Sequence, residues 1–176
     1  VAPRAAVRRV IDSVEDLTGV ALIFGLSFTL NAMILIVKAY VAPDTVDGAD
    51  SGSGLELVLV NLIASAILFG VMSAIVYGVG TLFGGEGSFL NIMAALAWHN
   101  LATVIFAPFL SFQTLATGVG GGFLLQLGIM LAIVWLLVNF VAEAHRFPST
   151  LKVAAVMFGL LFLPAFLLSI AGFGAM

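Results

Sequence analysis

Cysteine is absent from this chain of 176 residues, and charged residues make up only 9 % of it. The absence of cysteine excludes disulfides, thiolate metal sites and thiol catalysis. Soluble domains carry about a quarter charged residues, and so few charges cannot cover the surface of a soluble globule. Six Lys and Arg against nine Asp and Glu give a formal charge of −3, which excludes the basic surface that nucleic acid requires. No nucleic-acid partner is therefore expected.

Hydrophobic residues make up 62 % of the chain and gather in long runs. A bilayer core of about 30 Å needs roughly 20 apolar residues in each helix that crosses it. The five runs that meet this length cover approximately residues 17–37, 57–83, 92–112, 123–142 and 153–173. They are continuous rather than alternating, which excludes a transmembrane β-barrel. The sequence therefore predicts an all-α, polytopic integral membrane protein, with five transmembrane helices in one domain, residues 17–176.

Residues 1–16 form a separate N-terminal segment that precedes the first expected span. From Pro3 to Leu17, apolar residues recur at helical spacing with charged residues between them: Val7, Val10, Ile11, Val14 and Leu17. This pattern predicts a short amphipathic helix at the inner headgroup boundary. Arg4, Arg8 and Arg9 serve as an ordinary flank that sets the topology, or as contacts to anionic lipid or to a partner. The two interpretations are compatible.

Positive charge is distributed unevenly between the two sides of the expected bundle. Arg4, Arg8 and Arg9 precede the first span, and Arg146 and Lys152 lie between the fourth and the fifth. The opposite side carries Lys38 and several acidic residues. Because positive charge resists translocation, we expect the N-terminus in the cytoplasm and the C-terminus outside.

Small residues recur at every fourth position of the second expected span. This small-residue row consists of Ala66, Gly70, Ala74 and Gly78. Lipid tails are as apolar as leucine, so helices in a membrane associate through close packing at rows of this kind. We expect the row to pack inside the bundle and the second span to lie near its middle. Self-association through the row is the alternative.

Three polar residues within the expected spans are candidates for structure or transport: His99, Asn100 and Asn139. Polar groups in lipid are expensive and need partners. A proton or substrate pathway needs ionisable groups deep in several spans, and His99 is the only such group well inside. We therefore favour hydrogen bonds between helices, and a polar groove in spans three to five is the alternative.

Two turns on the expected cytoplasmic side stand out. The first reads Gly84-Gly85-Glu86-Gly87-Ser88-Phe89, and the second runs from Ala142 to Thr150 as Ala-Glu-Ala-His-Arg-Phe-Pro-Ser-Thr. Glycines allow sharp turns, and Ser88 and Ser149 or Thr150 can cap the helices that follow. The two turns can form one surface for a partner or for lipid. Its candidate residues are Gly84, Gly85, Glu86, Gly87, Ser88, Phe89, Glu143, His145 and Arg146.

Catalytic and metal chemistry are not indicated by any motif. The spacing of His99, His145, Glu86 and Glu143 matches no metal site. Ser88 does not fit the G-x-S-x-G pattern of a nucleophile. We expect no enzyme, no cofactor and no metal. An intramembrane enzyme would require Ser88, His99 and Glu86 within hydrogen-bond reach of one another.

The chain resembles the Yip family, the Ypt/Rab-interacting membrane proteins, in its small prokaryotic form. The resemblance rests on the five spans, on the two turn motifs and on the segment before the first span with Pro3, Arg8 and Arg9. The resemblance covers nearly the whole chain. Eukaryotic relatives bind prenylated Rab-type GTPases, associate with each other and support vesicle traffic, and they carry a longer cytosolic N-terminal region. This sequence shows no such region before its first span. GTPase binding is therefore not expected, and a bacterial inner-membrane relative is.

The expected function is that of a non-enzymatic Yip-type membrane protein. Such a protein organises the membrane, or binds another membrane protein as an accessory subunit. Membrane lipids and another membrane protein, or a second copy of the chain, are the expected partners. A transporter of a small solute or lipid, using the polar groove described above, is the alternative.

Overall fold

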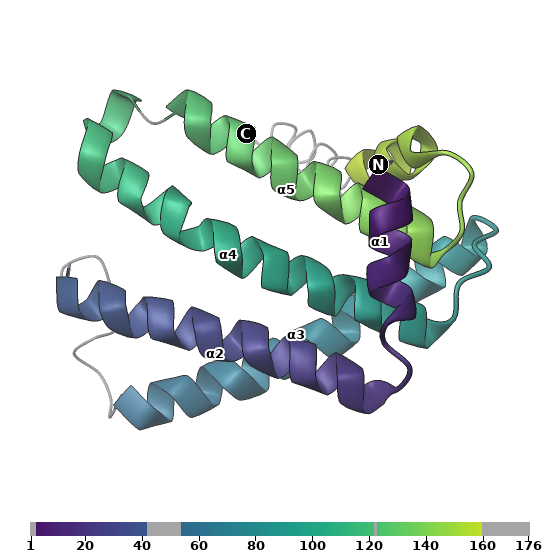
Figure 1. Ribbon diagram of the computed structural model, residues 1–176, viewed down its shortest axis with the longest axis horizontal. Helices are drawn as coiled ribbons and strands as arrows, with labels where there is room; N and C mark the ends of the chain where they lie inside the picture. Colours follow the sequence, from purple (N-terminus) through teal and green to yellow (C-terminus); the bar gives the residue numbers. More distant parts are fainter. Residues whose placement is uncertain (1–2, 42–53, 122, 160–176) are drawn as a thin grey trace, which may run out of the picture.

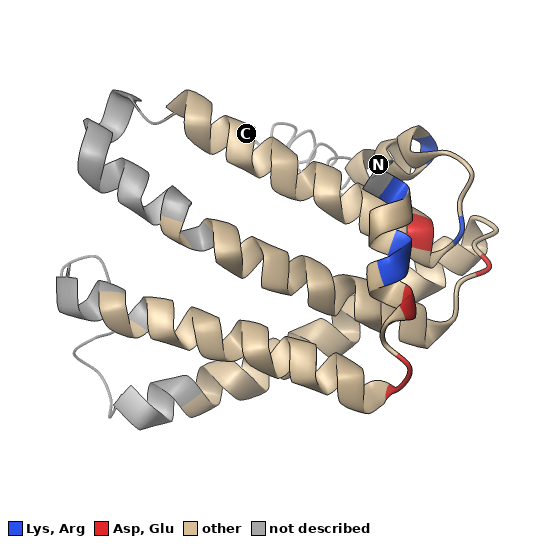
Figure 2. Ribbon diagram, in the orientation of Figure 1, with Lys and Arg blue, Asp and Glu red and all other residues tan. Residues whose placement is uncertain are grey.

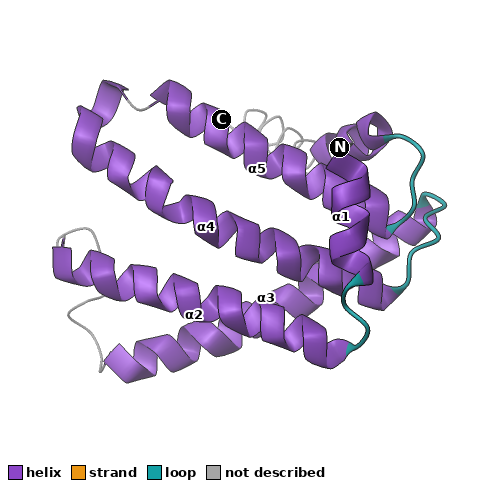
Figure 3. Ribbon diagram, viewed as in Figure 1, coloured by secondary structure: helices purple, strands orange, loops and turns teal. Residues whose placement is uncertain are grey.

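The computed structural model describes residues 3–41, 54–121 and 123–159, and every regular element in these ranges is a helix (Figures 1 and 3). In chain order the labelled helices are α1 (Pro3–Asp12), α2 (Leu17–Val41), α3 (Gly54–Leu82), α4 (Phe89–Gly121) and α5 (Phe123–Ala144). A shorter apolar helix follows at Thr150–Gly159. Four of the described helices, α2 to α5, are long and apolar enough to cross a membrane. The predicted all-α, polytopic membrane class is thereby confirmed.

The expected spans differ from the helices mainly at their ends. α4 begins at Phe89 and continues through Pro108 to Gly121, beyond the expected 92–112. Its 33 residues correspond to about 50 Å at 1.5 Å per residue, more than a hydrocarbon core of about 30 Å. Hydropathy marks the part of a helix that suits hydrocarbon, and not the residue at which backbone hydrogen bonding stops. For the expected fifth span, residues 160–173 lie outside the described part of the chain.

α4 is the central helix of the described bundle. It contacts α1, α2, α3 and α5, whereas α3 packs mainly on α4 within the described part of the chain. Among the described helices, the prediction that the second span lies near the middle is therefore wrong. The buried face of α4 is built from Ile92 and the small residues Ala94, Ala95 and Ala97, each at most 1 % exposed. Alanines on several sides of one helix allow several neighbours to approach it closely.

The small-residue row of α3 does not pack inside the described bundle. Ala66 and Ala74 are exposed, and a Cβ atom added to Gly70 or Gly78 would meet nothing within 4 Å. The prediction of internal packing is therefore wrong for the described part of the chain. The close approach of α3 to the bundle occurs near its C-terminal end instead, at Gly80.

α1 lies across the ends of α4 and α5 (Figure 1). Its apolar face is buried: Val7 and Ile11, together with Val14 just beyond the end of the helix, are at most 8 % exposed. These side chains join one hydrophobic cluster with residues of α4 and α5. Full burial of one such side chain stabilises a fold by roughly 1.5–3 kcal/mol. The apolar face therefore packs on protein, and the position of α1 at the inner headgroup boundary stays a prediction.

The three described connections between helices lie together at the end where α1 crosses the bundle (Figure 3). Each of the helices that follow them begins at a side-chain cap. Asp16 accepts a hydrogen bond from the Gly19 amide at 2.8 Å, at the start of α2. Ser88 Oγ accepts one from Asn91, and Ser149 Oγ one from Lys152. Such caps satisfy amide groups that the first helical turn leaves free.

Candidate functional site at the charged end of the bundle

Most charged side chains of the described residues gather where α1 crosses the ends of α4 and α5 (Figure 2). The cationic ones are Arg4, Arg8 and Arg9 on α1, with Arg146 and Lys152 near the end of α5. One carboxylate, Glu143, lies buried among them. This charged end contains most of the residues that the sequence singled out.

Glu143 holds α1 onto α5. Its side chain is 5 % exposed and forms ion pairs with Arg4 and Arg8. Arg4 binds Oε1 through Nε, and Arg8 Nε lies 3.1 Å from Oε2. Arg4 also donates to the carbonyl oxygens of Phe147 and Pro148, beyond the end of α5. Glu143 was expected as an exposed contact; its burial is explained by two arginines that compensate its charge.

The two turns of the charged end share one backbone geometry. At the end of α3, the amide of Gly84 binds Thr81 O and that of Gly85 binds Gly80 O. Gly84 has a φ of 83°, so a glycine occupies the left-handed position that ends many helices. At the end of α5, Arg146 takes the same position with a φ of 59°. A left-handed residue with a side chain costs roughly 1–2 kcal/mol.

His145 joins the two turns into one unit. Its backbone carbonyl accepts a hydrogen bond of 2.9 Å from the Glu86 amide. Its imidazole is 1 % exposed, and Nε2 lies 3.1 Å from the carbonyl oxygen of Val76 on α3. A carbonyl oxygen can only accept, so Nε2 carries a proton in this hydrogen bond. Burial lowers the pKa of His145 below 6.5, while the bond to Val76 opposes this shift.

Three glycines make room for His145 and its neighbour. A Cβ atom at Gly80 would overlap the imidazole ring, and one at Gly85 would lie 2.6 Å from Nδ1. A Cβ at Gly87 would overlap the backbone of Ala144. Gly85 and Gly87, predicted as surface contacts, therefore serve internal packing. Gly80 was not predicted as a contact, because it lies only two residues beyond Gly78 and falls outside the row of small residues at every fourth position.

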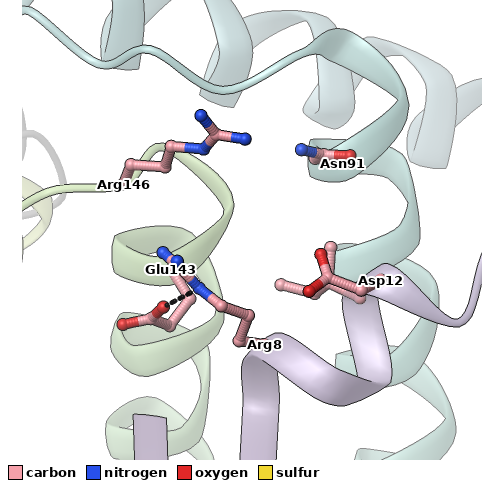
Figure 4. A pocket seen from close by; sticks show the side chains of 6 residues that line it. Arg8, Asp12, Asn91, Glu143 and Arg146 are labelled. Carbon is pink, nitrogen blue, oxygen red and sulfur yellow. Dashed lines mark hydrogen bonds and ion pairs between the residues drawn. The ribbon is translucent and has the colours of Figure 1, made fainter. Parts of the chain in front are cut away.

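A pocket opens beside Glu143, between α1, α4 and the end of α5 (Figure 4). It is lined by Arg8, Ile11, Asp12, Asn91, Glu143 and Arg146. Figure 4 shows the guanidinium group of Arg146 extended towards Asn91 across the opening. Sequence reasoning did not single out Asp12 and Asn91, because they come from different helices and follow no short motif.

The remaining predicted contacts stay at the surface. Arg9 donates to the carbonyl oxygen of Ala5 within α1 and is exposed. Gly84, Glu86 and Phe89 are exposed as well, and the Phe89 ring lies edge-on to Tyr77 at 5.6 Å. Ser88 serves as the cap of α4. These positions are compatible with the predicted contact surface but do not test it.

The polar residues of the spans do not converge. His99 Nε2 lies 3.3 Å from the carbonyl oxygen of Ile133 on α5. Asn100 donates to Ser27 Oγ on α2 at 3.3 Å. Asn139 is 3 % exposed and donates to the Trp135 carbonyl oxygen within α5. Each group is thus satisfied by one neighbour, in a different direction. In the described part of the chain, no three His, Asp or Glu side chains gather as metal ligands would.

Comparison with known proteins identifies the family of this chain. The Yip1 domain matches residues 1–172, which include α1, the two joined turns and all four long helices. Neither the curated proteins nor the solved structures contain a significant match. With nearly its whole length matched, the chain belongs to the Yip1-domain family of membrane proteins.

Proposed function

We propose that this protein is a non-enzymatic accessory membrane protein, which binds another membrane protein through the open face of α3. The observation that carries the proposal is the small-residue row Ala66, Gly70, Ala74 and Gly78, which faces no described part of the chain. A smooth row of this kind allows a second helix to approach closely.

The exposure of α3 supports this assignment. In Leu59–Leu82 the buried residues are Ser73 and Gly80, whereas 33 % of the residues in Phe89–Phe106 of the central helix are buried. Lipid chains can cover a surface of leucine side chains without a cost in free energy, because both are apolar. A small-residue row offers lipid little contact area, whereas a partner helix packed on it gains close van der Waals contact. The row is therefore better suited to a helix than to lipid.

The arrangement of polar groups also favours a role without transport or catalysis. A polar groove through spans three to five would need His99, Asn100 and Asn139 to face one opening. Instead, they bond to α5, α2 and α5 itself, respectively. Ser88 and His99 likewise bond to separate backbone partners. No described contact favours the transporter alternative.

The test uses one substitution at matched positions. Gly70→Leu and Gly78→Leu fill the row, while Gly25→Leu on α2 and Gly128→Leu on α5 are controls. All four glycines have nothing within 4 Å of an added Cβ, so each variant is expected to fold. After extraction in a lipid-preserving polymer, native mass spectrometry should show a stoichiometric membrane protein, or a second copy, with the wild type and the controls. The α3 variants should lose it.

Three results would contradict the proposal. A wild-type chain that is always alone has no stable partner to bind. A partner that stays bound to both α3 variants would dock elsewhere on the protein. A loss of stability in the α3 variants alone would indicate that the row packs within the chain.

We further propose that the protein lies in a bacterial cytoplasmic membrane, with its N-terminus inside and its C-terminus outside. The gathering of five cationic residues at one end of the bundle supports this orientation (Figure 2), because positive charge resists translocation. Since the chain has no cysteine, single cysteines can report each side. Ser88→Cys should react with an impermeant maleimide only after the membrane is opened, and Ser51→Cys in intact spheroplasts. The reverse pattern would overturn the orientation.

A further inference from the structure

The pocket at the charged end presents free charges of both signs. Glu143 is compensated, because Arg4 and Arg8 both bind it. Asp12 and Arg146 also line the pocket, but among the described residues neither forms an ion pair, either with the other or with a third group. Figure 4 shows both side chains at the same opening, with Asn91 facing Arg146. One free cation and one free anion therefore face a common space.

Both residues are placed against their local preference. Arg146 adopts a φ of 59°, a left-handed conformation that side-chain residues avoid. Asp12 is the last residue of α1, where the negative end of the helix dipole disfavours a carboxylate. Residues in sparsely populated backbone conformations, as Arg146 is, cluster at functional sites. Their meeting at one pocket indicates a ligand that interacts with both.

The position of the pocket limits the kind of ligand. α4 begins at Phe89 and α5 ends at Ala144, so the pocket lies where two long apolar helices leave the hydrocarbon. That level of a membrane contains the lipid headgroups. A simple anion would bind Arg146 but would be repelled by Asp12. A simple cation would bind Asp12 but would be repelled by Arg146. A zwitterionic headgroup satisfies both charges at once.

We propose that this pocket binds the phosphoethanolamine headgroup of a membrane lipid. The guanidinium of Arg146 and the amide of Asn91 donate to the phosphate, and the Asp12 carboxylate accepts hydrogen bonds from the primary ammonium. A primary ammonium has three N–H groups that can donate hydrogen bonds to a carboxylate. The trimethylammonium of a choline headgroup has no N–H group and donates no such hydrogen bond. The site therefore selects ethanolamine over choline. This proposal does not depend on the docking of a partner at α3.

The experiment measures lipid binding to the detergent-purified full chain by native mass spectrometry. Three phospholipids with the same acyl chains are titrated: phosphatidylethanolamine, phosphatidylcholine and phosphatidylglycerol. The wild type should bind phosphatidylethanolamine about tenfold more tightly than the other two, since one charge-assisted hydrogen bond has about this effect. Soluble glycerophosphoethanolamine at the same concentrations should form no adduct. An equally abundant soluble adduct would assign the site to a free solute and overturn the lipid assignment.

Two variants separate the two charges. Asp12→Asn should weaken phosphatidylethanolamine binding about tenfold and strengthen phosphatidylglycerol binding, because the repulsive carboxylate is gone. Arg146→Asn should weaken the binding of all three lipids. Asparagine tolerates the left-handed conformation, so this variant should remain folded. Glu15→Gln and Arg9→Asn, which lie outside the pocket, are the matched controls and should bind as the wild type does.

Each possible outcome decides the proposal. Equal binding of the three lipids by the wild type would overturn it. An unchanged preference for phosphatidylethanolamine in Asp12→Asn would also overturn it. Because both variants are expected to keep the wild-type thermal stability in detergent, a loss of binding with unchanged stability supports the site.

Discussion

The clearest prediction concerns one substitution at two nearby positions of α3. Gly78→Ala and Gly80→Ala both replace a helical glycine, and in an open position this change stabilises a helix by roughly 1 kcal/mol. Gly78 is such a position, because an added Cβ meets nothing within 4 Å. At Gly80 the added Cβ overlaps the imidazole of His145. We therefore expect opposite signs, with Gly78→Ala stabilising and Gly80→Ala destabilising.

The magnitude at Gly80 follows from how the imidazole is held. Its Nε2 is bonded to Val76, and its Nδ1 lies 2.6 Å from where a Cβ of Gly85 would be. The ring cannot move away without losing a buried hydrogen bond. Overpacking of this kind costs typically 1–3 kcal/mol, which exceeds the gain in helix propensity. The net expectation is a loss of about 2 kcal/mol in the free energy of unfolding.

A double mutant tests the cause directly. His145→Ala removes the ring and by itself destabilises the protein, because it leaves a cavity. In that background Gly80→Ala meets free space, so it should become stabilising by roughly 1 kcal/mol. Equilibrium unfolding in mixed micelles, followed by the fluorescence of the two tryptophans, measures all four proteins. A clash with the imidazole is refuted as the cause if Gly80→Ala destabilises both backgrounds equally, or if Gly78→Ala is as destabilising as Gly80→Ala.

Two further predictions concern the contacts of α5 at the charged end. Glu143→Gln should loosen α1 at a cost of about 1–3 kcal/mol, because two arginines lose their charged acceptor; faster hydrogen exchange in α1 is the readout. Glu15→Gln is the control, and unchanged exchange in the Glu143 variant would contradict the role of the ion pairs. For His145, burial lowers the pKa of the folded state below 6.5, so the unfolded state binds the proton more strongly. Its contribution to stability is complete above pH 6.5 and is lost as the pH falls below that value. The slope of stability between about pH 7 and 5 should thus be smaller in His145→Gln than in the wild type, and equal slopes would disprove it.

Local signals in the sequence predicted much of the charged end. Ser88 and Ser149 cap their helices as expected, because a cap needs only a side-chain oxygen close to the first turn. Gly84 ends α3 for a similarly local reason. The burial and the bonding partners of Glu143 and His145 do not follow from local sequence. Their partners, Arg4, Arg8 and Val76, are remote in sequence, and only the fold brings them together.

The packing of α3 shows why the interior was harder to predict. In a soluble protein, polar residues mark the outer face of a helix, so periodicity separates inside from outside. In a membrane, lipid-facing and protein-facing residues are both apolar, and this distinction disappears. Gly70, Gly78 and Gly80 therefore look equivalent in the sequence. In the fold, the first two face open space and the third faces a histidine ring.

The sequence alone determined the class of this protein, because the free energy of moving a side chain from water to lipid depends on the residue and hardly on its neighbours. Long apolar runs thus revealed an all-α membrane protein, and its short turn motifs revealed the family. Tertiary structure decided which helix is central, which glycines are contacts, and how Glu143 is neutralised. It also placed Asp12 and Arg146, two charges from opposite ends of the chain, at one pocket. These outcomes depend on distances between remote residues, and such distances exist only once the helices are packed together.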